Sequence, residues 1–270
     1  MRDGLELIPL YSSSGGNSTL IKCNGSCFLI DCGKNCKQTE AALMSVGVLP
    51  DDIECIFVTH GHADHINGID VFVRKHHAAV FATSVSHRKM KDIATKEHNA
   101  SQYITIEENE VVTLDCAAEV MALPTPHDIL GSVVYKVKNL ITGKTVAVMT
   151  DLGEFTSAME GFSKGVDAIL IESNYDPVML RNGPYPYPLQ RRISGGKGHI
   201  SNEMCARQVK RLYDSGTRKF ILGHLSPNNN TDEKALETTE GYMSKFGLVK
   251  GRDYELRTAD KLKPTEGYEV

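Results

Sequence analysis

The pattern of apolar and polar positions divides the chain into three parts. From 18 to 101, short apolar runs alternate with amphipathic stretches, which predicts strands alternating with helices. From 102 to 150 the apolar runs have strand length and follow one another directly, which predicts a strand meander. After 150, helical patterns again alternate with apolar strands. This order favours an α+β fold with two sheets face to face and helices outside, a four-layer αββα sandwich.

The individual elements can be placed from the same pattern. A hairpin is predicted around Asn24-Gly25, because this dipeptide favours the tight turns that join antiparallel strands. Helices are predicted at 38–46, 67–76 and 84–93. Strands are predicted at 18–23, 27–33, 54–59, 78–83, 102–106, 110–115, 118–125, 131–139, 144–151, 166–173 and 217–224.

Composition narrows the class of protein without naming a function. The 270 residues carry a formal net charge of -4, so nucleic-acid binding would need a local basic patch. No linker or low-complexity tract appears, and we expect one domain over 1–270. The first residues lack the apolar run of a secretory leader, and no segment has the length and apolar character of a membrane span. Seven cysteines, an odd number, favour free thiols in a cytoplasmic protein.

Four predicted strands end in an acid or a histidine. These residues are His60, His127, Asp151 and His224. Sheet-based folds often place a functional site at the edge where strands end. Each residue alone fits a polar strand end in solvent, but four together indicate a shared site.

The segment "THGHADH" contains the densest chemistry in the chain. His60 and His62 flank Gly61, so both imidazoles can face one side of an extended segment. Asp64 and His65 follow a turn and can reach a second centre about 3.5–4 Å away, the usual spacing of paired metal ions. Imidazole and carboxylate ligands suit Zn, Mn or Fe. The alternative is a polar loop that begins a helix.

This segment resembles the HxHxDH motif of the metallo-β-lactamase fold, and the resemblance extends over essentially the whole chain. It implies that fold, a dinuclear hydrolase, and a hydroxide shared by two divalent transition-metal ions as nucleophile. It implies these ligands: His60, His62 and His127 for the first ion, Asp64, His65 and His224 for the second, and Asp151 as the bridge.

A later segment resembles the nuclease branches of this superfamily. Glu172 ends an apolar strand and His199 lies in "GKGHISNE", similar to the pair in which tRNase Z proteins use a histidine as general acid. The residues in "ESN-D-ML-GPYP-PL-RRI--GHISN" resemble the YycJ/WalJ branch, which implies 5′→3′ exonuclease action on DNA. Asp64, Glu172 and His199 are therefore the expected catalytic residues. Tyr175 departs from the histidine expected in that branch.

Cations lie close to His199 in the sequence. Arg191, Arg192 and Lys197 precede it and are candidates for binding the phosphates of a nucleic acid, DNA more than RNA. An ordinary solvated surface would look the same at any one of these positions.

Two other classes of function remain open. A small-molecule hydrolase, either a cyclic phosphodiesterase or a thioesterase of the glyoxalase II type, could use the same ligands. A thioesterase has no evident need for the pair of Glu172 and His199. A non-catalytic, metal-bound regulatory module would be expected to have lost ligands, and none of the seven is missing.

Overall fold

Two β-sheets form the centre of the molecule. The computed structural model describes residues 4–94, 96 and 100–270, and the strands of these residues form two sheets of seven. The N-terminal sheet has the order β14-β1-β2-β3-β4-β5-β6, and the C-terminal sheet has the order β13-β12-β11-β10-β9-β8-β7. The N-terminal sheet consists of β1 (Leu5–Ser13), β2 (Gly16–Cys23), β3 (Ser26–Ile30), β4 (Ile53–Phe57), β5 (Ala79–Ala82), β6 (Tyr103–Thr105) and β14 (Tyr268–Glu269). The C-terminal sheet consists of β7 (Val111–Leu114), β8 (Ala118–Pro124), β9 (Val133–Asn139), β10 (Thr145–Met149), β11 (Ala168–Glu172), β12 (Lys219–Gly223) and β13 (Glu255–Thr258).

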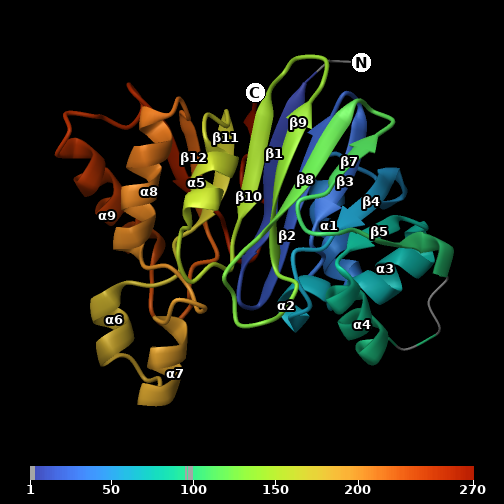
Figure 1. Ribbon diagram of the computed structural model, residues 1–270, viewed down its shortest axis with the longest axis horizontal. Helices are drawn as coiled ribbons and strands as arrows, with labels where there is room; N and C mark the ends of the chain where they lie inside the picture. Colours follow the sequence, from blue (N-terminus) through green and yellow to red (C-terminus); the bar gives the residue numbers. More distant parts are fainter. Residues whose placement is uncertain (1–3, 95, 97–99) are drawn as a thin grey trace.

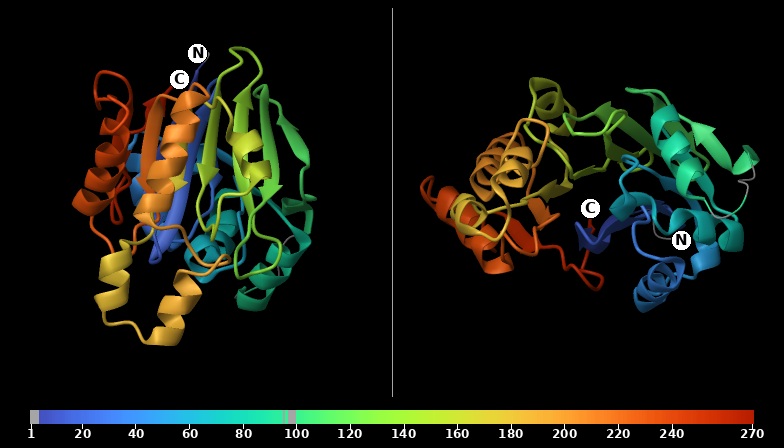
Figure 2. Two further views of the ribbon diagram at one scale, coloured as in Figure 1. Left: turned by 60° about the vertical axis from the view of Figure 1, so that its left-hand side comes forward. Right: turned by 90° about the horizontal axis from the view of Figure 1, so that it is seen from below.

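Helices cover the outer face of each sheet, which makes the four layers visible in Figure 1 and, seen from below, in Figure 2. The α-helices are α1 (Cys36–Ser45), α2 (Ala63–Ile66), α3 (Ile69–His76), α4 (Ser84–Ile93), α5 (Ser157–Ser163), α6 (Pro177–Asn182), α7 (Tyr187–Ile193), α8 (Asn202–Asp214) and α9 (Asp232–Ser244). Short 3-10 helices are Pro50–Asp52 and Ala100–Gln102. None of the helices in the described residues combines the length and the apolar character needed to cross a membrane.

Each interface between layers has its own apolar core. Phe28, Phe57 and Tyr135 belong to the cluster between the sheets. Phe72 belongs to the cluster under α1 and α3, and Phe220 to the cluster under α5, α8 and α9. Because strands buried on both faces need apolar side chains at every position, these strands read as continuous apolar runs in the sequence.

Parallel strands direct their carboxyl ends to one edge of the sandwich. In the N-terminal sheet β3, β4, β5 and β6 run parallel, and in the C-terminal sheet β10, β11, β12 and β13 do so. Loops from both sheets therefore meet at this edge, where α2 lies in Figure 1. Beyond the same edge, α6 and α7 project away from the sandwich (Figure 2).

The predicted αββα sandwich is confirmed, and so is the hairpin at Asn24-Gly25, which joins β2 and β3 with both residues at positive φ. The elements that were not predicted include the first strand β1, the two-residue strand β14 that pairs with it, the edge strand β13, the short helix α2 and the projecting helices α6 and α7.

Candidate metal centre

The "THGHADH" segment follows β4 and is held by the loop that follows β3. The backbone N–H of Cys32 donates to the carbonyl of His65, 2.9 Å away. Gly33 lies so close to this segment that a Cβ on it would come within 1.7 Å of the carbonyl oxygen of Asp64. Only glycine allows this approach. The loop after β3 thus fixes the position of the histidine-rich segment.

Three imidazoles converge on one point. The Nδ1 of His62 lies 3.0 Å from the Nε2 of His60 and 3.3 Å from the Nε2 of His127. His60 and His62 come from the loop after β4, and His127 follows β8. These three nitrogens are grouped closely enough to bind one metal ion.

A second group lies beside the first and contains more carboxylate. The Nε2 of His65 is 3.5 Å from Asp64 Oδ2, and the Nε2 of His224 is 3.8 Å from the same oxygen. Asp151 lies between the groups, with Oδ2 3.3 Å from His65 Nε2 and Oδ1 4.0 Å from His127 Nε2. The structure therefore brings all seven predicted ligands together, with Asp151 between the two groups.

Two aspartates and one histidine at this edge adopt the left-handed backbone conformation, which glycine adopts far more readily than other residues. Asp31, Asp151 and His224 have φ of 63°, 60° and 53°, and each follows the end of a strand. Left-handed residues other than glycine concentrate at functional sites, where the surroundings hold them in place. The sharp turn directs these side chains across the edge of the sheet and into the centre.

Each of the five histidines is also contacted at its other ring nitrogen. His65 Nδ1 lies 2.7 Å from Asp31 Oδ2, and His224 Nδ1 lies 2.8 Å from Glu172 Oε1. His62 Nε2 lies 3.5 Å from a carboxylate oxygen of Asp128. The remaining contacts are His60 Nδ1 with Thr59 Oγ1 at 3.0 Å and His127 Nδ1 with the Gly198 carbonyl at 3.2 Å. Such contacts orient histidine ligands toward a metal ion.

Glu172 holds a further histidine at the same centre. Its Oε1 lies 2.7 Å from His199 Nδ1, in addition to its contact with His224. Its Oε2 accepts from the backbone N–H groups of Leu152 and Ile200, both at 3.2 Å. The side chain of Glu172 is fully buried. His199 is thereby turned so that its Nε2 can face the cavity lined by His62, Asp64, His127, Asp151, His199 and His224 together with Ser14, Ala63 and Arg192.

The charges of the centre fit two divalent cations. Burial and the neighbouring His65 hold the pKa of His60 well below its usual value, so this imidazole stays neutral, which is the form that binds metal. Burial opposes the charging of His224, but the carboxylate of Asp151 outweighs it and raises the pKa of His224 to about 10. Asp151 Oδ2 and His224 Nε2 are buried and have no hydrogen-bond partner among the described residues. Cations would satisfy both atoms.

The three cationic residues predicted to bind the substrate lie in different surroundings. Arg192 lines the metal cavity, where its Nε donates to Asp128 Oδ2 over 2.6 Å. Arg191 lines a neighbouring cavity. Lys197 is exposed in the loop before His199, outside the lining of both cavities.

Several residues of the centre were not predicted from the sequence. Asp31, Thr59 and Asp128 orient histidines, and the amide of Asn17 donates to Asp64 Oδ2 over 3.2 Å. One signal was present for Asp31, because "CFLID" is another apolar strand that ends in an acid. Nothing comparable marks Asn17 or Asp128.

The family model and the relatives that match this chain agree with the resemblances found in the sequence motifs. The family model described as "Beta-lactamase superfamily domain" matches residues 27–225. The chain is 31% identical over 263 residues to exodeoxyribonuclease YycJ of Bacillus anthracis, covering 97% of this chain and 98% of the relative. It is 30% identical to exodeoxyribonuclease WalJ of Streptococcus pneumoniae, covering 94% of this chain and 93% of the relative.

A solved structure supports the same fold. The short form of human tRNase Z superimposes with a TM-score of 0.65 at 18% identity, covering 97% of this chain and 98% of that chain. At this identity the likeness concerns the fold. The resemblances to the metallo-β-lactamase fold and to the YycJ/WalJ branch, predicted from the motifs, are confirmed.

Proposed function

The chain belongs to the β-lactamase superfamily, in the family of the exodeoxyribonucleases YycJ and WalJ, and we propose that it is a two-metal exonuclease that hydrolyses the phosphodiester bonds of DNA. Residues 1–270 would act as one catalytic domain, degrading DNA in the 5′→3′ direction. The relatives' names support the substrate, and the clusters of histidine and aspartate support the metal dependence.

The seven clustered side chains would hold the ions. His60, His62 and His127 form one ligand set, Asp64, His65 and His224 form the other, and Asp151 joins them. Two divalent ions of Zn, Mn or Fe would supply positive charge to the scissile phosphate and lower the pKa of water. Asp64, which lines the cavity, would also accept a hydrogen bond from the attacking water.

The contact between Glu172 and His199 is the observation that carries the proposal. Hydrolysis forms a P–O bond to water and breaks the P–O bond to the sugar, and the departing oxygen needs a proton. Burial disfavours a charged His199, but the carboxylate of Glu172 more than compensates and raises the pKa of His199 above its usual value. With Nδ1 held by Glu172, His199 would donate this proton from Nε2.

The test is His199→Ala, measured on two substrates. We expect unchanged metal content and a loss of DNA hydrolysis of about 10²–10⁴-fold, the usual contribution of an acid–base group. A nitrophenyl phosphodiester should lose much less, because its leaving group hardly needs a proton. Equal losses on both substrates would reject the acid role of His199.

The wild-type protein provides the test of substrate class. DNA and RNA labelled at either end, with Mn or Zn present, should show stepwise shortening of DNA from the 5′ end. Hydrolysis of a thioester or a cyclic nucleotide with no action on DNA would favour a small-molecule hydrolase instead.

A further inference from the structure

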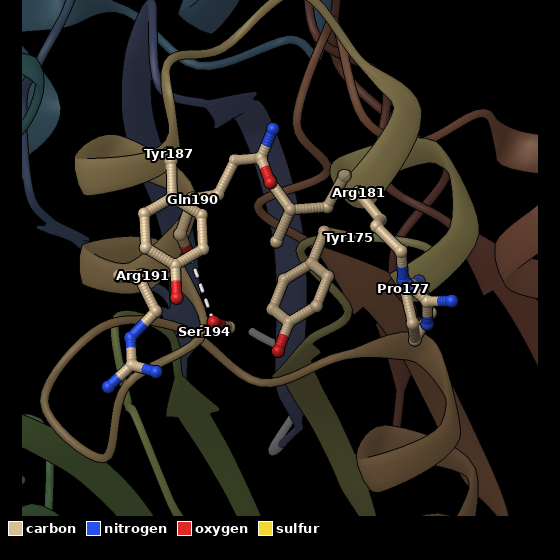
Figure 3. A pocket seen from close by; sticks show the side chains of 8 residues that line it. Tyr175, Pro177, Arg181, Tyr187, Gln190, Arg191 and Ser194 are labelled. Carbon is tan, nitrogen blue, oxygen red and sulfur yellow. Dashed lines mark hydrogen bonds between the residues drawn. The ribbon is translucent and has the colours of Figure 1, made fainter.

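A second cavity, of about 250 Å³, lies between α6 and α7. Figure 3 shows Tyr187 and Arg191 on one side of it and Tyr175 on the other. Its lining consists of Tyr175, Pro177, Leu180, Arg181, Tyr187, Gln190, Arg191 and Ser194. Since Arg191 lines this cavity and the adjacent Arg192 lines the metal cavity, α7 is a wall of both.

Backbone hydrogen bonds join Tyr175, which lines the cavity, to the segment that follows His199, the proposed general acid. Tyr175 follows β11 by three residues, and its segment runs parallel to the segment at Ser201. The carbonyl of Tyr175 accepts from the N–H of Asn202 at 2.9 Å, and the N–H of Asn174 donates to the carbonyl of Ile200 at 3.1 Å. The cavity therefore adjoins the backbone that positions Glu172 and His199, on the side where the proposed leaving group departs.

The charge of the cavity differs from that of the metal centre. Arg181 and Arg191 are exposed, and within the part of the chain that the structure describes neither guanidinium has a carboxylate partner. Arg192, in contrast, is paired with Asp128. Two unpaired guanidinium groups beside a pair of tyrosines suit a ligand with both a phosphate and an aromatic ring.

We propose that the cavity between α6 and α7 binds the terminal nucleotide of a DNA strand. Its base would stack on the exposed ring of Tyr187, above the buried Tyr175, and its phosphate would contact Arg181 and Arg191. The volume lies below the roughly 300–1,000 Å³ of pockets for drug-sized ligands, a size that suits a single base. This inference rests on the proposed nuclease function.

Binding of a fluorescent strand end tests the proposal. The probe is a single-stranded DNA with 2-aminopurine as its terminal base and a phosphorothioate at the adjoining linkage, which slows cleavage. With the metal-loaded protein, emission should fall at one end only, the end from which DNA is degraded, and should not fall with 2-aminopurine at an internal position. Tyr187→Ala should abolish the fall in emission and weaken binding about 5- to 150-fold, the range for loss of one stacked base.

The arginines are tested by salt dependence. Arg191→Ala should weaken binding and reduce the slope of log affinity against log salt by about one unit. Arg207→Ala is the matched control, because Arg207 is exposed on α8 and has no carboxylate partner among the described residues. It should leave affinity and slope unchanged.

The outcomes separate the two proposals. If the wild-type protein degrades DNA while Tyr187→Ala keeps both the emission change and the affinity, the pocket assignment is wrong and the nuclease assignment stands. If the wild-type protein neither binds nor degrades DNA, both are wrong. Equal quenching at terminal and internal positions would also overturn the terminal pocket.

Discussion

One oxygen atom of Glu172 serves two histidines of the centre. Its Oε1 lies 2.7 Å from His199 Nδ1 and 2.8 Å from His224 Nδ1, while Oε2 is occupied by two backbone N–H groups. A carboxylate can accept all of these bonds because it has acceptor sites on both oxygens. An amide cannot, since one of its ends is a donor. The buried carboxylate thus couples a candidate metal ligand to the proposed acid.

We therefore expect Glu172→Gln to affect metal binding as well as turnover. The amide oxygen can accept either from the two histidines or from the two backbone N–H groups. The NH₂ group would then face the remaining N–H donors. Metal affinity should fall about 10–100-fold, the usual effect of removing an orienting partner. A titration against a chromogenic chelator measures this. His199→Ala is the control, because it should leave that affinity unchanged, and identical metal affinities for all three proteins would show that Glu172 does not orient His224.

At the scale of elements, the loop after β3 positions the histidine-rich loop after β4 by direct backbone contact. Gly33 donates its N–H to the carbonyl of Asn17 over 2.8 Å and packs against the backbone of Asp64. These atoms belong to main chain that other hydrogen bonds hold, so a side chain at 33 cannot be accommodated by a rotamer change.

Gly33→Ala should displace the loop that carries Asp64 and His65. We expect lower metal content, at least a 10-fold loss of activity by analogy with lost orienting contacts, and a destabilisation of about 1–3 kcal/mol from overpacking. Elemental analysis, an activity assay and urea unfolding measure these three effects. Gly161→Ala is the matched control, because a Cβ there meets nothing within 4 Å. It lies in a helix and should stabilise the protein slightly. A fully loaded, fully active Gly33→Ala protein would contradict the role of this contact.

In these loops, local sequence signals predicted some of the residues of the site, and long-range contacts hid others. The strands buried on both faces were predicted because apolar runs are local signals, and His60, His62, Asp64 and His65 were found because they are close together in sequence. Asp31 was missed because its partner His65 is 34 residues away, and only the packed structure brings the two together. The pairing of β1 with β14 joins residues from opposite parts of the chain, which no local pattern reveals.

Across the whole molecule, the candidate ligands come from both sheets. His60, His62, Asp64 and His65 follow β4 of the N-terminal sheet, while His127, Asp151 and His224 follow strands of the C-terminal sheet. Ions bound between them would link the two sheets and stabilise the folded chain, because a preformed set of ligands is absent from the unfolded state.

Removal of metal should therefore lower the melting temperature. Metal at 100 times its Kd contributes about 2.7 kcal/mol. For a chain of this size that corresponds to roughly 5–10 °C. Scanning calorimetry with and without a chelator measures it, and Asp151→Ala should respond to the chelator much less. A wild-type melting temperature that the chelator leaves unchanged would show that the centre does not link the sheets.

The pairing of β14 with β1 bears on how this protein is made. Tyr268 lies beside Leu7, and the N–H of Val270 donates to the carbonyl of Leu5 over 2.9 Å, so these late residues cover the edge of the first strand. During translation, β1 would emerge from the ribosome long before Tyr268 is synthesised. Throughout that interval the edge of β1 offers unpaired backbone groups, the feature that promotes association between nascent chains. The N-terminal sheet is finished only when translation has passed β14, so residues made much later in synthesis are the ones that protect the edge of β1.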